Sequence, residues 1–136
     1  MFHRTQFVQN VFEPARVSCK VYEKFSDNTK SSITVMNTGN TDAYIRVRLV
    51  FQWQDSKGNA VSRNFIEPTI YTANGWFLDG DGFTYYYPNP VAPEAFTLNL
   101  LDLEHPVKMT GIKEDLNNDG VYYYYYPVME VVAEAI

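Results

Sequence analysis

The sequence has little of the residue types that most catalytic and metal sites require. Its 136 residues include one cysteine and two histidines, so no intrachain disulfide can form and cysteine usage indicates no redox compartment. No HExxH pattern is present, His3 lies near the amino terminus, and His105 lies in an expected loop. Cys19 stands between Val17 and Val21 in an alternating run, which favours a buried apolar residue over a reactive thiol. We therefore expect a protein that is not an enzyme.

Basic clusters and long apolar runs are also missing. The eleven Lys and Arg residues are scattered along a chain of formal net charge −5, which argues against nucleic acid as a partner. No run approaches the roughly eighteen apolar residues of a membrane-spanning helix. The first ten residues lack the apolar centre of a signal peptide. Export is therefore expected only if a signal peptide is absent from this sequence, and truncation at either end stays open.

Aromatic residues, in contrast, are abundant. Eleven Tyr, nine Phe and two Trp make up 16% of the chain, and such rings favour the pleated, half-buried surface of a β-sheet. The length fits one domain. With 46% hydrophobic and 20% charged residues, the composition is that of a globular protein.

The clearest element is one long alternating segment from Asp42 to Trp53. At about 3.3 Å per residue, a strand of this length is roughly 40 Å long. One of its two faces is wholly apolar and the other is mixed; the apolar face consists of Ala43, Ile45, Val47, Leu49, Phe51 and Trp53, and the opposite face of Tyr44, Arg46, Arg48, Val50 and Gln52.

Most of the remaining chain shows the same period of two, with turn residues about every eight to twelve positions. This spacing predicts a single antiparallel β-sandwich of about eight to ten strands, formed by residues 17–136. The other expected strands lie at 17–22, 31–36, 60–66, 70–78, 83–87, 96–103, 107–112 and 121–132. Three prolines in residues 88–93 predict an extended connection.

One turn has the spacing of a calcium ligand set. Asp115, Asn117 and Asp119 occupy the first, third and fifth positions of a calcium loop, followed by the turn glycine Gly120. Position twelve is Tyr126, where a bidentate Glu is needed, and no flanking helices are expected. A plain β-turn and a structural calcium ion both stay open, and no other cofactor is expected.

A dense aromatic cluster is the candidate ligand platform. It consists of Trp76, Phe77, Tyr85, Tyr86 and Tyr87. Exposed rings on a β-sandwich can stack on sugar rings, whereas alternation along a strand places half of such rings in the core. Both interpretations stay open.

Residues 1–16 form an apolar amino-terminal arm that ends near Pro14. Its apolar residues include Phe7, Val8, Val11 and Phe12. Such a segment can add to an exposed sheet edge, either of its own domain or of a neighbouring copy. Addition to a neighbour gives a head-to-tail contact that need not close, and therefore a fibre.

Several ordered motifs resemble those of exported proteins with SipW-type signal peptides, the group of Gram-positive bacterial proteins that includes camelysin and the TasA-like biofilm matrix proteins. The resemblance extends from about Phe7 to the carboxyl terminus. It rests on Asn37 to Arg48, Trp53, Gly75-Trp76-Phe77, Asp81 to Tyr87, Val91-Ala92-Pro93-Glu94 and Val131 to Ile136.

This resemblance implies a secreted or cell-surface β-sandwich of jelly-roll type, whose fibre-forming relatives donate an amino-terminal strand to the next subunit. Some relatives are labelled metallopeptidases, but no residues here match a zinc-protease motif. The first hypothesis is thus a non-enzymatic structural or adhesive surface protein, such as a biofilm-matrix fibre subunit, whose partners are itself or related surface proteins. The alternative is a module that binds glycan or another surface ligand.

Overall fold

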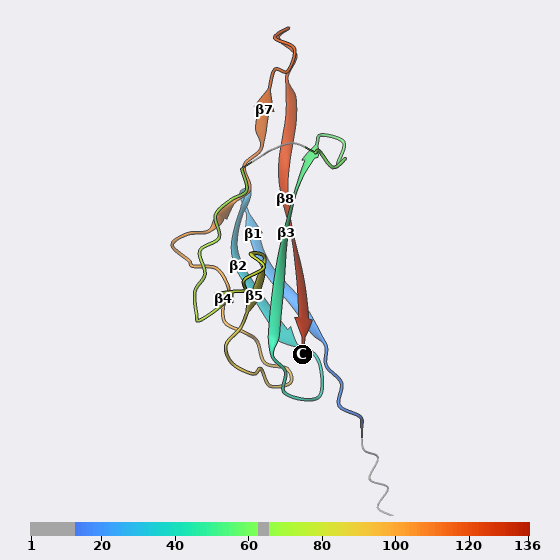
Figure 1. Cartoon of the computed structure of the whole chain (residues 1–136), viewed down its shortest axis with the longest axis vertical. Coiled ribbons are helices and arrows are strands. Elements are labelled where there is room, and N and C mark those ends of the chain that lie inside the picture. The colour runs from blue at the N-terminus through green and yellow to red at the C-terminus, as the bar shows by residue number, and fades with distance from the viewer. Residues whose placement is uncertain (1–12, 63–65) are drawn as a thin grey trace, which may run out of the picture.

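The computed structural model describes residues 13–62 and 66–136, and this part of the chain forms eight strands in two antiparallel sheets (Figure 1). The first sheet has the order β1-β2-β6 and the second the order β4-β5-β3-β8-β7. The predicted all-β class with antiparallel pairing is confirmed. The first sheet consists of β1 (Cys19–Ser26), β2 (Thr29–Asn37) and β6 (Val107–Lys108). The second consists of β4 (Phe77–Leu78), β5 (Thr84–Tyr86), β3 (Ile45–Asp55), β8 (Tyr123–Ala135) and β7 (Ile112–Glu114).

The long alternating segment forms β3, the centre of the second sheet. It pairs with β8 along its whole length, from Ile45 opposite Ala135 to Asp55 opposite Tyr125. Its apolar face lies inward as predicted, and Ile45 and Val47 have no exposed surface. Burial of each such side chain contributes about 1.5–3 kcal/mol, which fixes the register because a one-residue slip would expose the whole face.

The core is shared by both sheets and by the segments that connect them. Its fully buried residues come from β2, β3, β6 and the connection before β6. They are Ile33, Val35, Ile45, Val47, Leu100, Leu101 and Val107.

Segment 96–103, predicted as a strand, is not one. It runs beside β2, but two of its side chains replace main-chain partners: Thr97 Oγ1 accepts from Val35 N at 3.0 Å, and Asn99 Oδ1 accepts from Ile33 N at 2.9 Å. The segment therefore lies beside β2 as a strand would, but side-chain oxygens take part in its hydrogen bonds to β2. At this edge of β2, the main-chain N–H groups bond to side-chain oxygens, whereas in a regular ladder they would bond to main-chain carbonyls.

Other predicted strands are shorter than the pattern indicated. Residues 70–78 contribute only β4, and 107–112 divides into β6 in one sheet and the start of β7 in the other. In 60–66, Ala60 forms a single bridge with Gln54, and residues 63–65 lie outside the described part. The proline-rich connection, residues 88–93, contains no ladder strand, as predicted, but it bends at residues 88–89 and Val91 forms a single bridge with Ala43.

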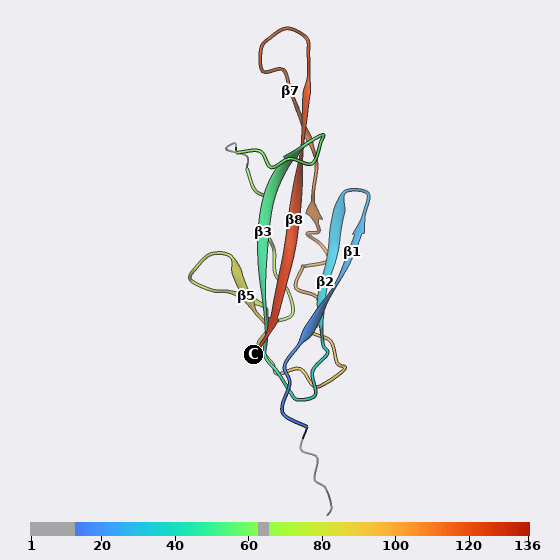
Figure 2. The ribbon, with the colours of Figure 1, turned by 90° about the vertical axis from the view of Figure 1, so that its right-hand side faces the viewer.

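The β7–β8 hairpin projects beyond the rest of the molecule, at the opposite end of the long axis from residues 13–17 (Figures 1 and 2). The β1–β2 hairpin turns through Asp27 and Asn28, whose φ angles of 52° and 56° fit a tight two-residue turn. Among the described residues, no helix is long and apolar enough to cross a membrane.

Candidate functional site

The structure divides the aromatic cluster between core and surface. Trp76, Tyr85 and Tyr87 are 4%, 6% and 9% exposed, and Trp76 Nε1 donates a hydrogen bond to the Leu98 carbonyl at 3.0 Å. The side chain of Phe77 is 53% exposed. The rings of Phe77 and Tyr86 stack with centroids 5.7 Å apart. Of the five rings, only Phe77 and Tyr86 therefore lie where a ligand could stack on them.

In the turn with calcium-ligand spacing, the aspartates bind the backbone. Asp115 Oδ1 and Oδ2 accept hydrogen bonds from the main-chain N–H groups of Asp119 and Gly120 at 3.1 and 3.0 Å. Asp119 Oδ1 accepts from the N–H of Val121 at 3.0 Å. Asn117 is exposed in the same turn. In residues 13–62 and 66–136, no three His, Cys, Asp or Glu side chains gather closely enough to hold a metal ion.

The turn between β4 and β5 is organised in the same way by Asp81. Its carboxylate accepts hydrogen bonds from the N–H groups of Phe83 and Thr84, both at 2.9 Å, and from the Thr84 hydroxyl. The Thr84 hydroxyl and these N–H groups stabilise the ionised form and lower the pKa of Asp81. The carboxylate therefore holds the turn between β4 and β5 in place.

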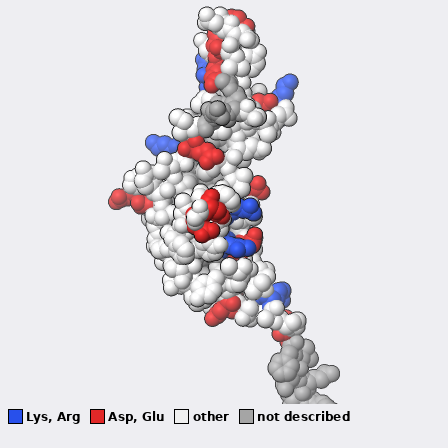
Figure 3. Space-filling view, in the orientation of Figure 1, with Lys and Arg blue, Asp and Glu red and all other residues white. Residues whose placement is uncertain are grey.

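The outer face of β3 and β8 carries an ion pair. Arg46 Nε donates to Glu134 Oε2 at 3.1 Å, and its Nη2 contacts the same oxygen. Hydrogen bonding from Arg46 lowers the pKa of Glu134. Elsewhere on the view of Figure 3, acidic and basic atoms are interspersed among broad uncharged areas.

The effect of this pair on stability should depend on pH. Because the pKa of Glu134 is lower in the folded than in the unfolded protein, the stabilisation is present above the unfolded value, about 4.3, and is lost as the pH falls through the folded value. We expect Glu134→Gln to lower the unfolding midpoint at pH 7, and the difference from the parent protein to disappear in acid. Glu130→Gln, on the same face and in no ion pair with a described residue, is the control for thermal scans from pH 7 to pH 3. A Glu134→Gln deficit that persists unchanged at pH 3 would contradict this account.

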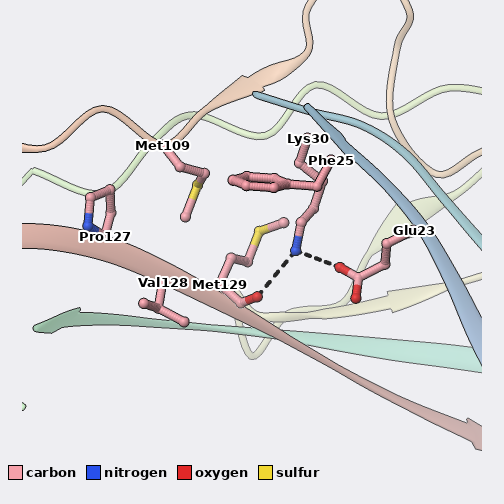
Figure 4. A pocket seen from close by; sticks show the side chains of 7 residues that line it. All are labelled: Glu23, Phe25, Lys30, Met109, Pro127, Val128 and Met129. Atoms are coloured by element: carbon pink, nitrogen blue, oxygen red, sulfur yellow. Dashed lines mark hydrogen bonds and ion pairs between the residues drawn. The ribbon is translucent and has the colours of Figure 1, made fainter. Parts of the chain in front are cut away.

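A groove of about 390 Å³ lies between the turn end of the β1–β2 hairpin and β8 (Figure 4). Its walls are mainly apolar, and a Lys30–Glu23 ion pair lies on one side. Lys30 Nζ also donates to the Met129 carbonyl at 3.2 Å. The lining residues are Glu23, Phe25, Lys30, Met109, Pro127, Val128 and Met129.

This groove could not be predicted from the sequence, because it depends on a β-bulge. The register of β1 on β2 shifts between Lys24 and Phe25, so that Ser31 is the extra residue of β2. The shift turns Lys30, which is only 7% exposed, toward the interior. The only sign of the groove in the sequence is Lys30 beside an apolar strand, and a lysine in that position normally indicates an exposed residue.

Beside the groove, β1 is an edge strand, because among the described residues it pairs only with β2. The N–H of Asn37 points away from β1, to the Ala95 carbonyl. Cys19, opposite Asn37, is therefore not hydrogen bonded to it. Hydrogen-bonded and non-hydrogen-bonded pairs alternate along an antiparallel pair of strands. The main-chain N–H and C=O groups of Val21 and Glu23 therefore also point away from β2, at the outer edge of β1. We refer to this edge and the groove together as the candidate strand-acceptor surface.

The arm residues Phe7, Val8, Val11 and Phe12 lie outside the described residues. The chain just after them is anchored to the turn after β2: Arg16 N donates to Asn40 Oδ1 at 2.7 Å, and Asn40 Nδ2 donates to the Pro14 carbonyl at 3.1 Å. The comparisons with protein-family models, curated proteins and solved structures found no match to this chain.

Proposed function

We propose that this protein is a non-enzymatic structural protein of the cell surface or extracellular matrix, and that it assembles head to tail by strand addition. In this assembly, the apolar arm of residues 1–16 of one copy pairs with the strand-acceptor surface of the next. The observation that carries the proposal is the open edge of β1 beside an apolar groove. Natural proteins usually protect such an edge, because it is a template for another strand.

The composition of the two partners supports the proposal. Phe25, a wall of the groove, is 56% exposed, and the arm provides four large apolar residues within six positions, Phe7 to Phe12. Main-chain hydrogen bonds along the edge provide affinity in strand addition, and alternate side chains in a groove provide specificity.

The direction of the chain favours a neighbouring copy as the acceptor. Residues 13–18 lead into the first residue of β1, Cys19, whereas the groove is lined by Glu23 and Phe25 near the other end of that strand. The ribbon in Figure 2 shows residues 13–18 at the end of β1 away from its hairpin turn. If the arm of one copy adds to this surface of another copy, the contact joins two different surfaces and can repeat without closing.

The proposal also includes a sandwich topology for the fold and secretion of the protein. Two sheets around a shared core fit a β-sandwich, and we place its topology in the jelly-roll class. The motif resemblance to SipW-dependent exported proteins, with Asn37 to Arg48 as its longest motif, supports secretion and a role in the biofilm matrix.

Removal of the arm is expected to abolish assembly. A chain that begins at Val17 should stay monomeric in sedimentation velocity and form no fibres in electron micrographs under conditions in which the full chain assembles. A synthetic peptide of residues 1–16 should bind to the shortened chain and inhibit assembly of the full one. If the shortened chain assembles as readily as the full chain, strand donation is wrong.

A point variant distinguishes assembly through the groove from nonspecific association of exposed apolar side chains. Phe25→Ala should raise the concentration required for assembly about tenfold, because it removes roughly 1.4 kcal/mol of apolar contact. The matched control is Leu98→Ala, which removes another exposed apolar side chain, 59% exposed, from a segment on the far side of β2. Equal effects of the two variants would contradict the assignment of the groove.

A further inference from the structure

A second hollow, unrelated to the acceptor surface, lies at the base of the projecting hairpin. It has a volume of about 620 Å³ and lies between the turn after β3 and the beginning of β8. A site of this size is within the range that holds small ligands in proteins. We call it the tyrosine cleft, and its described lining residues include Ser56, Lys57, Asn59 and four consecutive tyrosines, Tyr122 to Tyr125.

The cleft exists because β8 is longer than its partner. β3 ends at Asp55, opposite Tyr125, while β8 begins further out along the hairpin. Ile136 and Tyr44 exchange two hydrogen bonds of 2.8 Å, so alternate residues of β8, counted back from Ile136, direct their main-chain groups toward β3. Tyr124 is one of these residues. Its N–H and C=O therefore face the position that β3 would occupy if it continued.

The polar wall of the cleft is a rigid turn. Asp55 Oδ1 accepts hydrogen bonds from the main-chain N–H groups of Lys57 and Asn59, both at 2.9 Å, and Asp55 N donates to the Asn59 carbonyl at 2.9 Å. These N–H groups and the Asn59 side chain, which contacts Asp55 Oδ2 at 3.5 Å, lower the pKa of Asp55. The carboxylate fixes the turn, and the side chains of Ser56 and Lys57 project from it as exposed groups.

The aromatic wall presents rings from both faces of one strand. Tyr122, Tyr123 and Tyr124 are 49%, 43% and 46% exposed, and successive residues of a strand point to opposite sides. Lys113 Nζ lies 4.1 Å from the centroid of the Tyr122 ring, which holds that ring from the β7 side. Each exposed ring offers an apolar face and a hydroxyl group.

This combination fits one chemical class. We infer that the tyrosine cleft binds a neutral oligosaccharide of two or three sugar rings. The C–H faces of sugar rings stack on tyrosine, and their hydroxyls take hydrogen bonds from phenols, Ser56, Asn59 and the main chain of Tyr124. The one lysine and one aspartate of the wall cancel in charge, which disfavours an anionic polymer, and the polar turn disfavours an acyl chain.

The experiment uses the full chain and four neutral probes: cellotetraose, chitotetraose, laminaritetraose and mannotetraose. We expect saturable binding of at least one probe, measured by calorimetry and by NMR shifts of tyrosine ring signals. Tyr124→Ala should weaken that binding about tenfold, because the loss of one stacking contact costs about 1.4 kcal/mol. The unfolding midpoint should not change. Phe77→Ala tests the competing candidate platform, because it removes a ring of similar exposure, 53% against 46% for Tyr124, from β4 of the same sheet.

Three results would overturn the inference. The first is the absence of binding by all four probes, and the second is binding that is lost in Phe77→Ala but retained in Tyr124→Ala. The third is displacement of a bound sugar from the tyrosine cleft by the peptide of residues 1–16, since the cleft would then be a docking site for the arm. The assembly proposal is independent of the first two results, because its variants lie on β1 and in the arm.

Discussion

Substitution of Asn37 by alanine is expected to lower the free energy of unfolding by about 3 kcal/mol. Asn37 ends β2 and has no exposed surface. Its Nδ2 donates to the carbonyls of Thr41 and Val91 at 2.8 and 2.7 Å, and its Oδ1 accepts from the N–H of Gly39 at 2.8 Å. One side chain therefore joins the end of β2, the turn after it and the proline-rich connection.

The magnitude follows from the groups that lose their partner. The Val91 carbonyl also accepts from the N–H of Ala43 at 3.0 Å and keeps that bond in the variant. The Thr41 carbonyl and the Gly39 N–H lose the Asn37 side chain, and each such loss in a buried site costs about 1–3 kcal/mol.

The control for this variant lies in the same turn. Asn40→Ala removes hydrogen bonds to Pro14 and Arg16 that are open to water, so it should cost no more than about 1 kcal/mol. Urea unfolding of both variants followed by tryptophan fluorescence measures the difference. If both lose the same free energy, the buried network around Asn37 is not the source of the stability.

The features of the fold that depend on local periodicity could be predicted from the sequence. The two faces of β3 and the lack of a ladder strand in the proline-rich connection both follow from residue types within a few positions. The irregular course of 96–103 could not be predicted, because Thr97 and Asn99 bind a strand more than sixty positions away. The role of Asn37 could not be predicted either, because the sequence does not reveal that its side-chain amide is buried.

The candidate sites show the same limit. Alternation indicates that some rings of the aromatic cluster are internal but not which ones, and the structure places Trp76 and Tyr85 in the core. The groove requires the bulge at Ser31, and the tyrosine cleft requires the difference in length between β3 and β8. The bulge is a register shift within the β1–β2 hairpin, but the groove also needs β8, which is distant in the sequence. The tyrosine cleft depends on the pairing of β3 with β8, a register that is set by core packing.

Glu23→Gln is expected to destabilise the protein by about 2 kcal/mol. Lys30 is 7% exposed and pairs with the carboxylate of Glu23, so loss of that carboxylate leaves a cation in the groove with only the Met129 carbonyl as a described partner. Breaking a fully buried pair costs roughly 3–5 kcal/mol. A smaller value is expected here because the Glu23 side chain is 34% exposed and water reaches the site.

A second substitution distinguishes loss of a favourable pair from exposure of an unpaired charge. In Glu23→Gln combined with Lys30→Met, no buried cation remains, and the methionine extends the apolar wall formed by Phe25, Met109 and Met129. The double variant should therefore recover most of the lost free energy in urea unfolding, because apolar replacements of buried ion pairs are often neutral or stabilising. If the double variant is no more stable than Glu23→Gln alone, an unpaired buried cation is not the cause of the lost free energy. Recovery would instead show that the groove tolerates an uncharged lining, and that the charged pair is not required for folding.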